Sequence, residues 1–267
     1  MESPITVMTY NLRDRGKGSR ERESAQDAWL ADHLPTILTA QEFWDPTGRH
    51  GDDLVADLAD RLGMCGFAVP SPNSNCHLGL LWQPEQAELI SFEAIKWNFW
   101  HGVGVGTFRV GGRTLRVVVA HLAPTSPPQR FMEAYNLAKL ADTPGVPTII
   151  GADFNNVGEL DPEPDIGEWG PNQRARRREW SADPAAPTKV DRRPMLLLSQ
   201  AGVHDAATVL QADWYPTADL AVGSGVRFDG IRVNGEAAGL LWRHRVYDSP
   251  ELRELSDHLP VAVTLAV

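Results

Sequence analysis

The sequence predicts an α+β protein in which two packed sheets are covered by helices. Strand-like segments of branched apolar residues recur along the whole chain, and each half also contains helix-like segments. The 267 residues are 42% apolar and 22% charged, as in ordinary globular proteins. No repeat or linker divides the chain, so we expect one domain over residues 1–267.

The first half alternates strands and helices before it becomes a run of strands. Leu54, Leu58 and Leu62 fall on one face of a predicted helix, and Gly63 ends it. The pair Gly111 and Gly112 predicts a hairpin between two strands. The strands expected here cover 5–10, 36–40, 78–82, 88–95, 103–110 and 114–122, and the helices cover 23–34 and 52–62.

The second half contains a long polar segment. Residues 156–189 are rich in Pro, Gly and charge and are expected to form an excursion from the sheets. Pro194 is well placed for the first turn of a helix. The other elements expected are helices at 130–140 and 194–199 and strands at 146–152, 226–233, 240–246 and 261–265.

Charge and cysteine content narrow the function classes. A net charge of −10 disfavours tight, sequence-indifferent binding of nucleic acid, so we expect no stable nucleic-acid complex. A nucleic-acid enzyme is still compatible with this charge, because acidic residues also serve as metal ligands. No apolar run is long enough for a transmembrane segment and no secretory signal is seen, which predicts a cytoplasmic protein. Secretion after removal of a signal is the alternative left open. Cys65 and Cys76 are expected to be free and buried. The oligomeric state is left open.

Polar residues that suit metal and phosphate chemistry follow the apolar strands. Burying a carboxylate or an imidazole costs several kcal/mol unless the group is paired or binds a metal. Glu, Asp and amide oxygens suit Mg²⁺ or Mn²⁺ better than Zn²⁺, and histidines beside such an ion suit proton transfer. The residues at these positions are Asn11, Glu42, His121, Asp153, Asn155, Asp229, Asp257 and His258.

Five short segments that contain most of these residues resemble, in their order and approximate spacing along the chain, the motif set of the endonuclease/exonuclease/phosphatase superfamily, the deoxyribonuclease-I-like fold. The resemblance extends from Thr6 to Leu265. It implies a four-layer α/β/β/α sandwich of two mainly antiparallel sheets flanked by helices. The segments are Thr9–Leu12, Gln41–Glu42, Ala120–Leu122, Gly151–Asn155 and Ser256–Pro260.

The resemblance implies a metal-assisted attack of water on phosphorus, in line with the leaving oxygen, in a phosphodiester or phosphomonoester. Glu42 would be the principal Mg²⁺ ligand, with Mn²⁺ as an alternative ion, and Asn11 and Asp257 would complete the metal site. Asp153 would orient or deprotonate the attacking water. Asn155 would hold a phosphate oxygen.

The resemblance also assigns two histidines to the phosphate. His258 would contact it and be polarised by Asp229, and His121 would stabilise it or protonate the leaving oxygen. The expected partner is a phosphorylated small molecule or a nucleic acid. Two kinds of enzyme stay open: a nuclease, and a phosphoesterase that acts on small molecules or lipid headgroups. A non-catalytic binding or scaffold protein on the same fold is the alternative, although every central residue is present.

Two departures from the family pattern lie near the predicted site. Arg13 stands where some relatives have an additional acid, and Gly230 replaces a common aromatic residue.

Three further features have both a functional and a structural interpretation. Trp97 and Trp100 predict either an aromatic platform for substrate or a structural role in hairpin packing or a dimer contact. Arg176 and Arg177 belong to the one dense basic cluster, which is either a solvated face or a phosphate clamp. A structural role is expected for three histidines, at positions 77, 101 and 204, and core positions are expected for Trp82 and Trp242.

Overall fold

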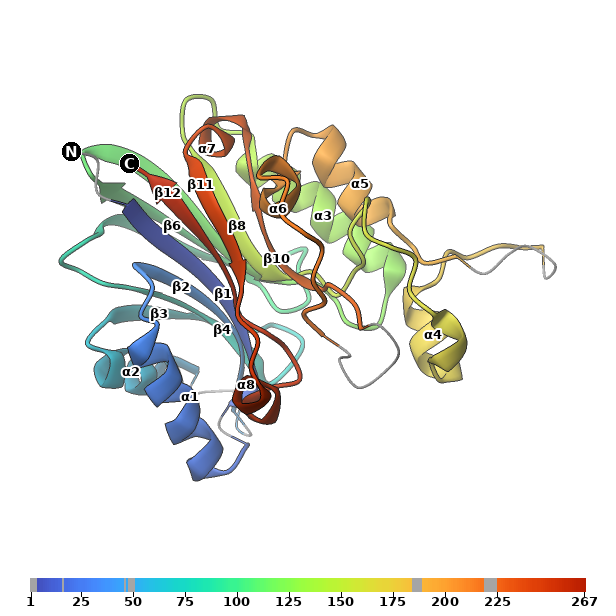
Figure 1. The fold of residues 1–267 in the computed structure, drawn as a ribbon, viewed down its shortest axis with the longest axis horizontal. Helices are drawn as coiled ribbons and strands as arrows, with labels where there is room; N and C mark the ends of the chain where they lie inside the picture. The colour runs from blue at the N-terminus through green and yellow to red at the C-terminus, as the bar shows by residue number, and fades with distance from the viewer. Residues whose placement is uncertain (1–3, 16, 46, 48–50, 184–188, 219–224) are drawn as a thin grey trace.

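The computed structural model describes residues 4–15, 17–45, 47, 51–183, 189–218 and 225–267. Two six-stranded sheets pack face to face, with helices on both outer surfaces (Figure 1). The predicted four-layer sandwich is therefore confirmed.

Each sheet is antiparallel except at one pair of strands. The order in the first sheet is β11-β12-β1-β2-β4-β3, and in the second sheet β5-β6-β7-β8-β10-β9. The first comprises β1 (Pro4–Arg15), β2 (Ile37–Trp44), β3 (Cys65–Val69), β4 (Cys76–Trp82), β11 (Leu241–Val246) and β12 (Val261–Ala266). The second comprises β5 (Glu88–Ile95), β6 (Val103–Val110), β7 (Arg113–His121), β8 (Thr148–Asp153), β9 (His204–Asp205) and β10 (Asp229–Val233). Among the described strands, β1/β2 and β7/β8 are the parallel pairs.

The helices divide between the two outer faces. Figure 1 shows α1 (Arg20–Asp32), α2 (Gly51–Leu62) and α8 (Pro250–Leu255) on the side of the first sheet, and α3 (Pro127–Ala141) and α5 (Arg193–Gln200) on the side of the second. The predicted excursion contains α4 (Pro171–Arg177), which lies away from the sheets. Two short helices, α6 (Ala206–Val209) and α7 (Gly235–Ala238), are too short to leave a helical pattern in the sequence.

The alternation of side chains along the strands builds three apolar layers. Val7 of β1 faces the other sheet, whereas Met8 packs under the helices of the first sheet. Val117 and Val119 of β7 likewise point between the sheets, and Val118 packs against α3 and α5. Because helices cover the outer faces, the central strands β4, β7 and β8 are buried on both faces and read as largely apolar runs, whereas the edge strands β5 and β11 are partly exposed.

Some predictions about single residues are wrong. Trp82 is buried as predicted, but Trp242 is 68% exposed, because β11 is an edge strand whose register shifts beside it. Cys65 and Cys76 are free, as expected, but Cys65 is exposed and Cys76 only half-buried.

Over the described residues, no helix has the length and apolar character that crossing a membrane requires.

Truncating a side chain between the sheets should destabilise the fold. Leu80 is fully buried and belongs to the layer that both sheets share. We expect Leu80→Ala to lower the free energy of unfolding by about 2–5 kcal/mol, measured by urea denaturation. Leu160→Ala is the matched control, since Leu160 is 73% exposed, and it should change the value by about 0.5 kcal/mol or less. Equal effects of the two substitutions would contradict this account of the core.

Candidate active site

The predicted site residues gather where the two parallel strand pairs end. Asn11 of β1 is in register with Gln41, beside Glu42 of β2, and His121 of β7 is in register with Asp153 of β8. Parallel strands deliver their carboxyl ends to the same edge of a sheet. The packing of the two sheets brings these two edges together.

Irregular backbone turns the key side chains toward that edge. Glu42 has φ +67°, and the pairing of β2 with β4 shifts register between Ala40 and Phe43. Asn155, after β8, has φ +49°. Left-handed backbone at non-glycine residues is strained, and bulges commonly re-aim a side chain beside an active site.

Asn11 connects the two sheets through its side-chain amide. It is fully buried, and its Nδ2 donates to Glu42 Oε1 and to Asp153 Oδ2, each at 3.0 Å. The backbone N–H of Asp14 donates to Glu42 Oε2 at 3.0 Å. The amide oxygen of Asn11 accepts from the N–H of Arg13. Asn11 therefore fixes the relative positions of the two carboxylates.

Asp153 is a buried carboxylate surrounded by donors. Its Oδ2 lies 3.3 Å from His121 Nε2 and 3.9 Å from His258 Nδ1, and its Oδ1 accepts from the N–H of Asn155 at 2.8 Å. Burial by itself would raise the pKa of Asp153, but the charges of His121 and His258 hold it well below its usual range. Burial likewise lowers the pKa of His121, and Asp153 outweighs this effect and raises it.

Asp229, which is buried, forms a second pair with His258, which is partly exposed. His258 Nδ1 donates to Asp229 Oδ2 at 2.8 Å, and the backbone N–H of Asp229 donates to Thr217 Oγ1 at 2.9 Å. Burial raises the pKa of Asp229 to about 6, although the charge of His258 opposes the rise. The pKa of His258, which burial alone would lower, is raised well above its usual value by Asp229 and Asp153. The contact between His258 Nδ1 and Asp229 Oδ2 therefore couples the titrations of the two groups.

The ring of His121 is stacked on His101, a residue for which the sequence predicts only a structural role. The ring centroids are 4.2 Å apart and the planes differ by 10°. His101 Nδ1 lies 2.9 Å from Ser74 Oγ, and burial, followed by the charge of His121, lowers the pKa of His101 well below its usual value. His101 thus supports His121 as a neutral ring. The sequence carries no signal of this contact, because it joins residues on different strand ends.

Two buried charged residues of α3 hold the segments around the stacked histidines, His101 and His121. Glu133 accepts from the N–H groups of Trp100 and Ala123, at 2.6 and 2.7 Å. Arg130 donates to the carbonyl of Ala123 and to the side chain of Asn156. These contacts fix the positions, relative to α3, of the segment that follows β7 and of the segment that follows Asn155.

The remaining predicted residues lie around the rim. Asp257 is exposed, and its Oδ1 is 3.8 Å from Nε of Arg13. Trp97 is 67% exposed, whereas Trp100 is half-buried.

In the basic cluster, Arg177 Nη1 donates to the carbonyl of Asn155 at 3.3 Å and its guanidinium carbon is 3.9 Å from the ring centroid of Phe228. The side chain of Arg176 is exposed. Arg177 therefore helps to hold the segment that carries Asn155.

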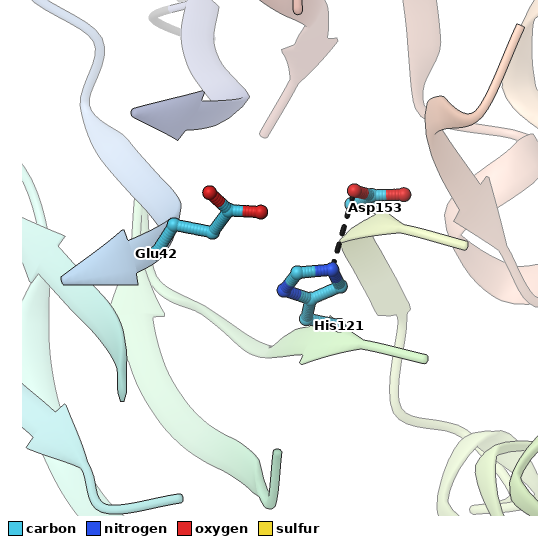
Figure 2. Close-up of side chains that lie close together, drawn as sticks. All are labelled: Glu42, His121 and Asp153. Carbon is cyan, nitrogen blue, oxygen red and sulfur yellow. Dashed lines mark ion pairs between the residues drawn. The ribbon is translucent and has the colours of Figure 1, made fainter. Parts of the chain in front are cut away.

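The residues present fit a divalent cation. Figure 2 shows Glu42 reaching from β2 toward His121 and Asp153, and one ligand atom from each of the three lies within 4.8 Å of the others. The same holds for Asp153, Asp229 and His258. Carboxylate oxygens held this close suit a hard ion such as Mg²⁺ or Mn²⁺.

Removing the charge of Asp229 should lower the pKa of His258. We expect Asp229→Asn to shift the titration of the His258 Hε1 resonance in NMR spectra to lower pH, because the imidazolium loses the carboxylate that stabilises it. The resonance that is missing from the spectrum of His258→Gln is the one that belongs to His258. Asp248→Asn, which removes a partner of the exposed Arg253, should leave the midpoint unchanged. A midpoint in Asp229→Asn equal to that of the wild type would contradict the coupling.

Comparison of the sequence with models of known families finds no match, and neither does comparison with curated proteins. Solved structures do match. The crystal structure of D. rerio TDP2 complexed with single-strand DNA product is similar with a TM-score of 0.69 and 15% identity, over 100% of both chains. An endonuclease/exonuclease/phosphatase from Bacteroides vulgatus has a TM-score of 0.70 and 15% identity, over 99% of both chains.

The human Nocturnin catalytic domain with bound sulfate anion has a TM-score of 0.63 and 19% identity, over 98% of this chain and 92% of that chain. Identities this low establish the architecture alone. The chain therefore has the fold of the endonuclease/exonuclease/phosphatase proteins, as its motifs predict.

Proposed function

We propose that this chain is a member of the endonuclease/exonuclease/phosphatase superfamily and a divalent-metal-dependent hydrolase of phosphate esters. The observation that carries the proposal is the convergence of side chains from distant segments on the buried carboxylate of Asp153. His121 and His258 lie against it, and the buried amide of Asn11 joins it to Glu42. Structural requirements alone rarely concentrate so many ionisable groups, and perturbed pKa values of this kind are typical of active sites.

Mg²⁺ is the proposed cofactor, with Mn²⁺ as a second candidate. Glu42 and Asp153 would hold it, with the predicted participation of Asn11 and Asp257 at its edge. When bound, the ion would neutralise charge on the phosphate oxygens. Arg13 lies beside Asp257 and competes for that carboxylate, so we propose that Asp257 contributes less than Glu42.

The protein's own groups would prepare the water and the phosphate. A general base works best when its pKa lies near the working pH, and the pKa of Asp153 is held far below it. Asp153 would therefore orient the attacking water more than deprotonate it. His258 and His121, whose pKa values are raised, would donate hydrogen bonds to phosphate oxygens, and Asn155 would hold another.

The identity of the esterified group stays a proposal in two forms, a nucleic acid or a phosphorylated small molecule. One fold neighbour holds a single-strand DNA product and another a sulfate anion, which has the shape of a phosphate group. A cytoplasmic location stays a prediction.

Separate losses of metal binding and turnover would test the proposed roles. We expect Glu42→Ala to abolish both Mg²⁺ binding in calorimetry and hydrolysis of phosphodiester and phosphomonoester substrates. His258→Ala should still bind Mg²⁺ but lose about 100-fold or more of kcat, because a positioned acid or donor contributes about that much.

Matched controls come from exposed residues of the same type. Glu85→Ala and His204→Ala should retain metal binding and turnover, since both side chains are exposed. Glu85 follows β4 at Trp82, which pairs with the start of β2, and His204 pairs with Val233 at the far end of β10 from Asp229. Retained turnover in Glu42→Ala, or an inactive wild type across a substrate panel with Mg²⁺ or Mn²⁺, would overturn the proposal.

Arg176 is proposed as a contact for the substrate phosphate, because it is exposed beside Arg177, which touches the Asn155 segment. We expect Arg176→Ala to raise KM several-fold with kcat unchanged, since it removes binding that the ground state and the transition state share. Arg243→Ala, on the edge strand β11, should leave KM unchanged. An unchanged KM in Arg176→Ala would remove this residue from substrate binding.

A further inference from the structure

A groove runs along α3 beside the candidate site. It has a volume of about 730 Å³ and lies between α3 and the loop that joins β5 to β6. Lys96 and Asn98 line it from the loop, and Gln129, Tyr135, Asn136 and Lys139 line it from the helix.

Both walls of the groove start at the histidine pair. The loop with Lys96 continues directly to His101, whose ring stacks on His121. The chain after His121 leads within a few residues to Ser126, the cap of α3, which also lines the groove. Glu133 fixes the two walls to each other through the N–H groups of Trp100 and Ala123. Both walls of the groove are therefore tied, within a few residues, to the segments that carry His101 and His121.

The charge of the groove is opposite to that of the chain. The sequence contains four lysines, Lys17, Lys96, Lys139 and Lys189, and two of them line this groove. No carboxylate is among the lining residues, although the chain has a net charge of −10. In the described part of the chain, neither Lys96 nor Lys139 forms an ion pair with a carboxylate. Two unpaired ammonium groups in an acidic protein favour an anionic ligand.

The other lining groups favour a ligand with rings and hydrogen-bonding edges. Tyr135 is 45% exposed, and the ammonium of Lys139 lies 4.6 Å from its ring centroid. The amides of Asn98, Gln129 and Asn136 offer both donors and acceptors. Phosphates on lysines, bases on an aromatic ring and amides at base edges are the contacts by which proteins hold single strands. An acyl chain would find few apolar partners here.

We propose that this groove binds the single-stranded nucleotide chain that leads away from the scissile phosphate. The proposal rests on the proposed hydrolysis of a phosphate ester and specifies the substrate as a nucleic acid. From Ser126 to Lys139, α3 is about 20 Å long at 1.5 Å per residue, which accommodates a few nucleotides. Binding through so few charges is weak and sensitive to salt, consistent with the expectation of no stable complex.

The test measures binding without turnover. A fluorescein-labelled oligothymidylate of about twelve nucleotides is titrated with the full chain in EDTA, and fluorescence anisotropy is recorded at several salt concentrations. We expect Lys96→Ala and Lys139→Ala each to weaken binding several-fold and to reduce the slope of log K against log salt by about one. Tyr135→Ala should weaken it about tenfold, and Tyr135→Phe should restore most of it.

Lys189→Ala is the charge-matched control, since Lys189 is exposed and outside the groove, and it should bind as the wild type does. The proposal is overturned if the wild type does not bind the oligonucleotide, if the groove variants bind it normally, or if Lys189→Ala weakens binding equally. It is also overturned if the groove variants lose binding to phosphatidylserine vesicles but keep binding to the oligonucleotide.

Hydrolysis of bis(4-nitrophenyl) phosphate by the wild type with Mg²⁺ or Mn²⁺ tests the proposed function separately. An inactive enzyme that binds the strand through the lysines would overturn the hydrolase and leave a nucleic-acid-binding groove.

Discussion

The buried carboxylate of Asp153 is the constraint on which the rest of the site depends. An ion at this depth costs several kcal/mol unless donors surround it, and its donors come from separate parts of the chain. Asn11 reaches it from the first sheet, His121 from the neighbouring strand of its own sheet, and the N–H of Asn155 from the residues after it. The hydrogen bond that Asn11 donates to the charged Asp153 therefore holds the two sheets together at this edge.

The topology explains why this edge, and not the opposite one, carries the chemistry. Each sheet contains one parallel pair, β1/β2 and β7/β8, and both pairs end at the same side of the sandwich. Four strand ends thus present side chains to one space. The left-handed backbone at Glu42 and the register shift in β2 then direct its carboxylate toward the second sheet. Local strain is balanced by hydrogen bonds from Asn11 and Asp14.

Much of the fold and part of the site follow from the sequence. The predicted bounds of β5 and β6 match the structure, and β6 ends at the clear turn residues Gly111 and Gly112. Asn11, Glu42 and Asp153 could be predicted because each follows an apolar strand. His101, Glu133 and Thr217 could not, since their roles come from contacts between segments far apart in the chain. Asp257 illustrates the limit of motif reading: its position was predicted, but its proximity to Arg13 was not.

The balance of charge in the site gives an independent reason to expect a cation. Glu42, Asp153 and Asp229 place three carboxylates around the site, and two of them raise the pKa values of the histidines that they contact, His121 and His258. A phosphodiester would add a further negative charge. Uncompensated charge in a buried site is costly. A divalent ion would offset more of this negative charge than a monovalent ion. Substrate and cation should therefore strengthen each other's binding, because each lowers the electrostatic cost of the other.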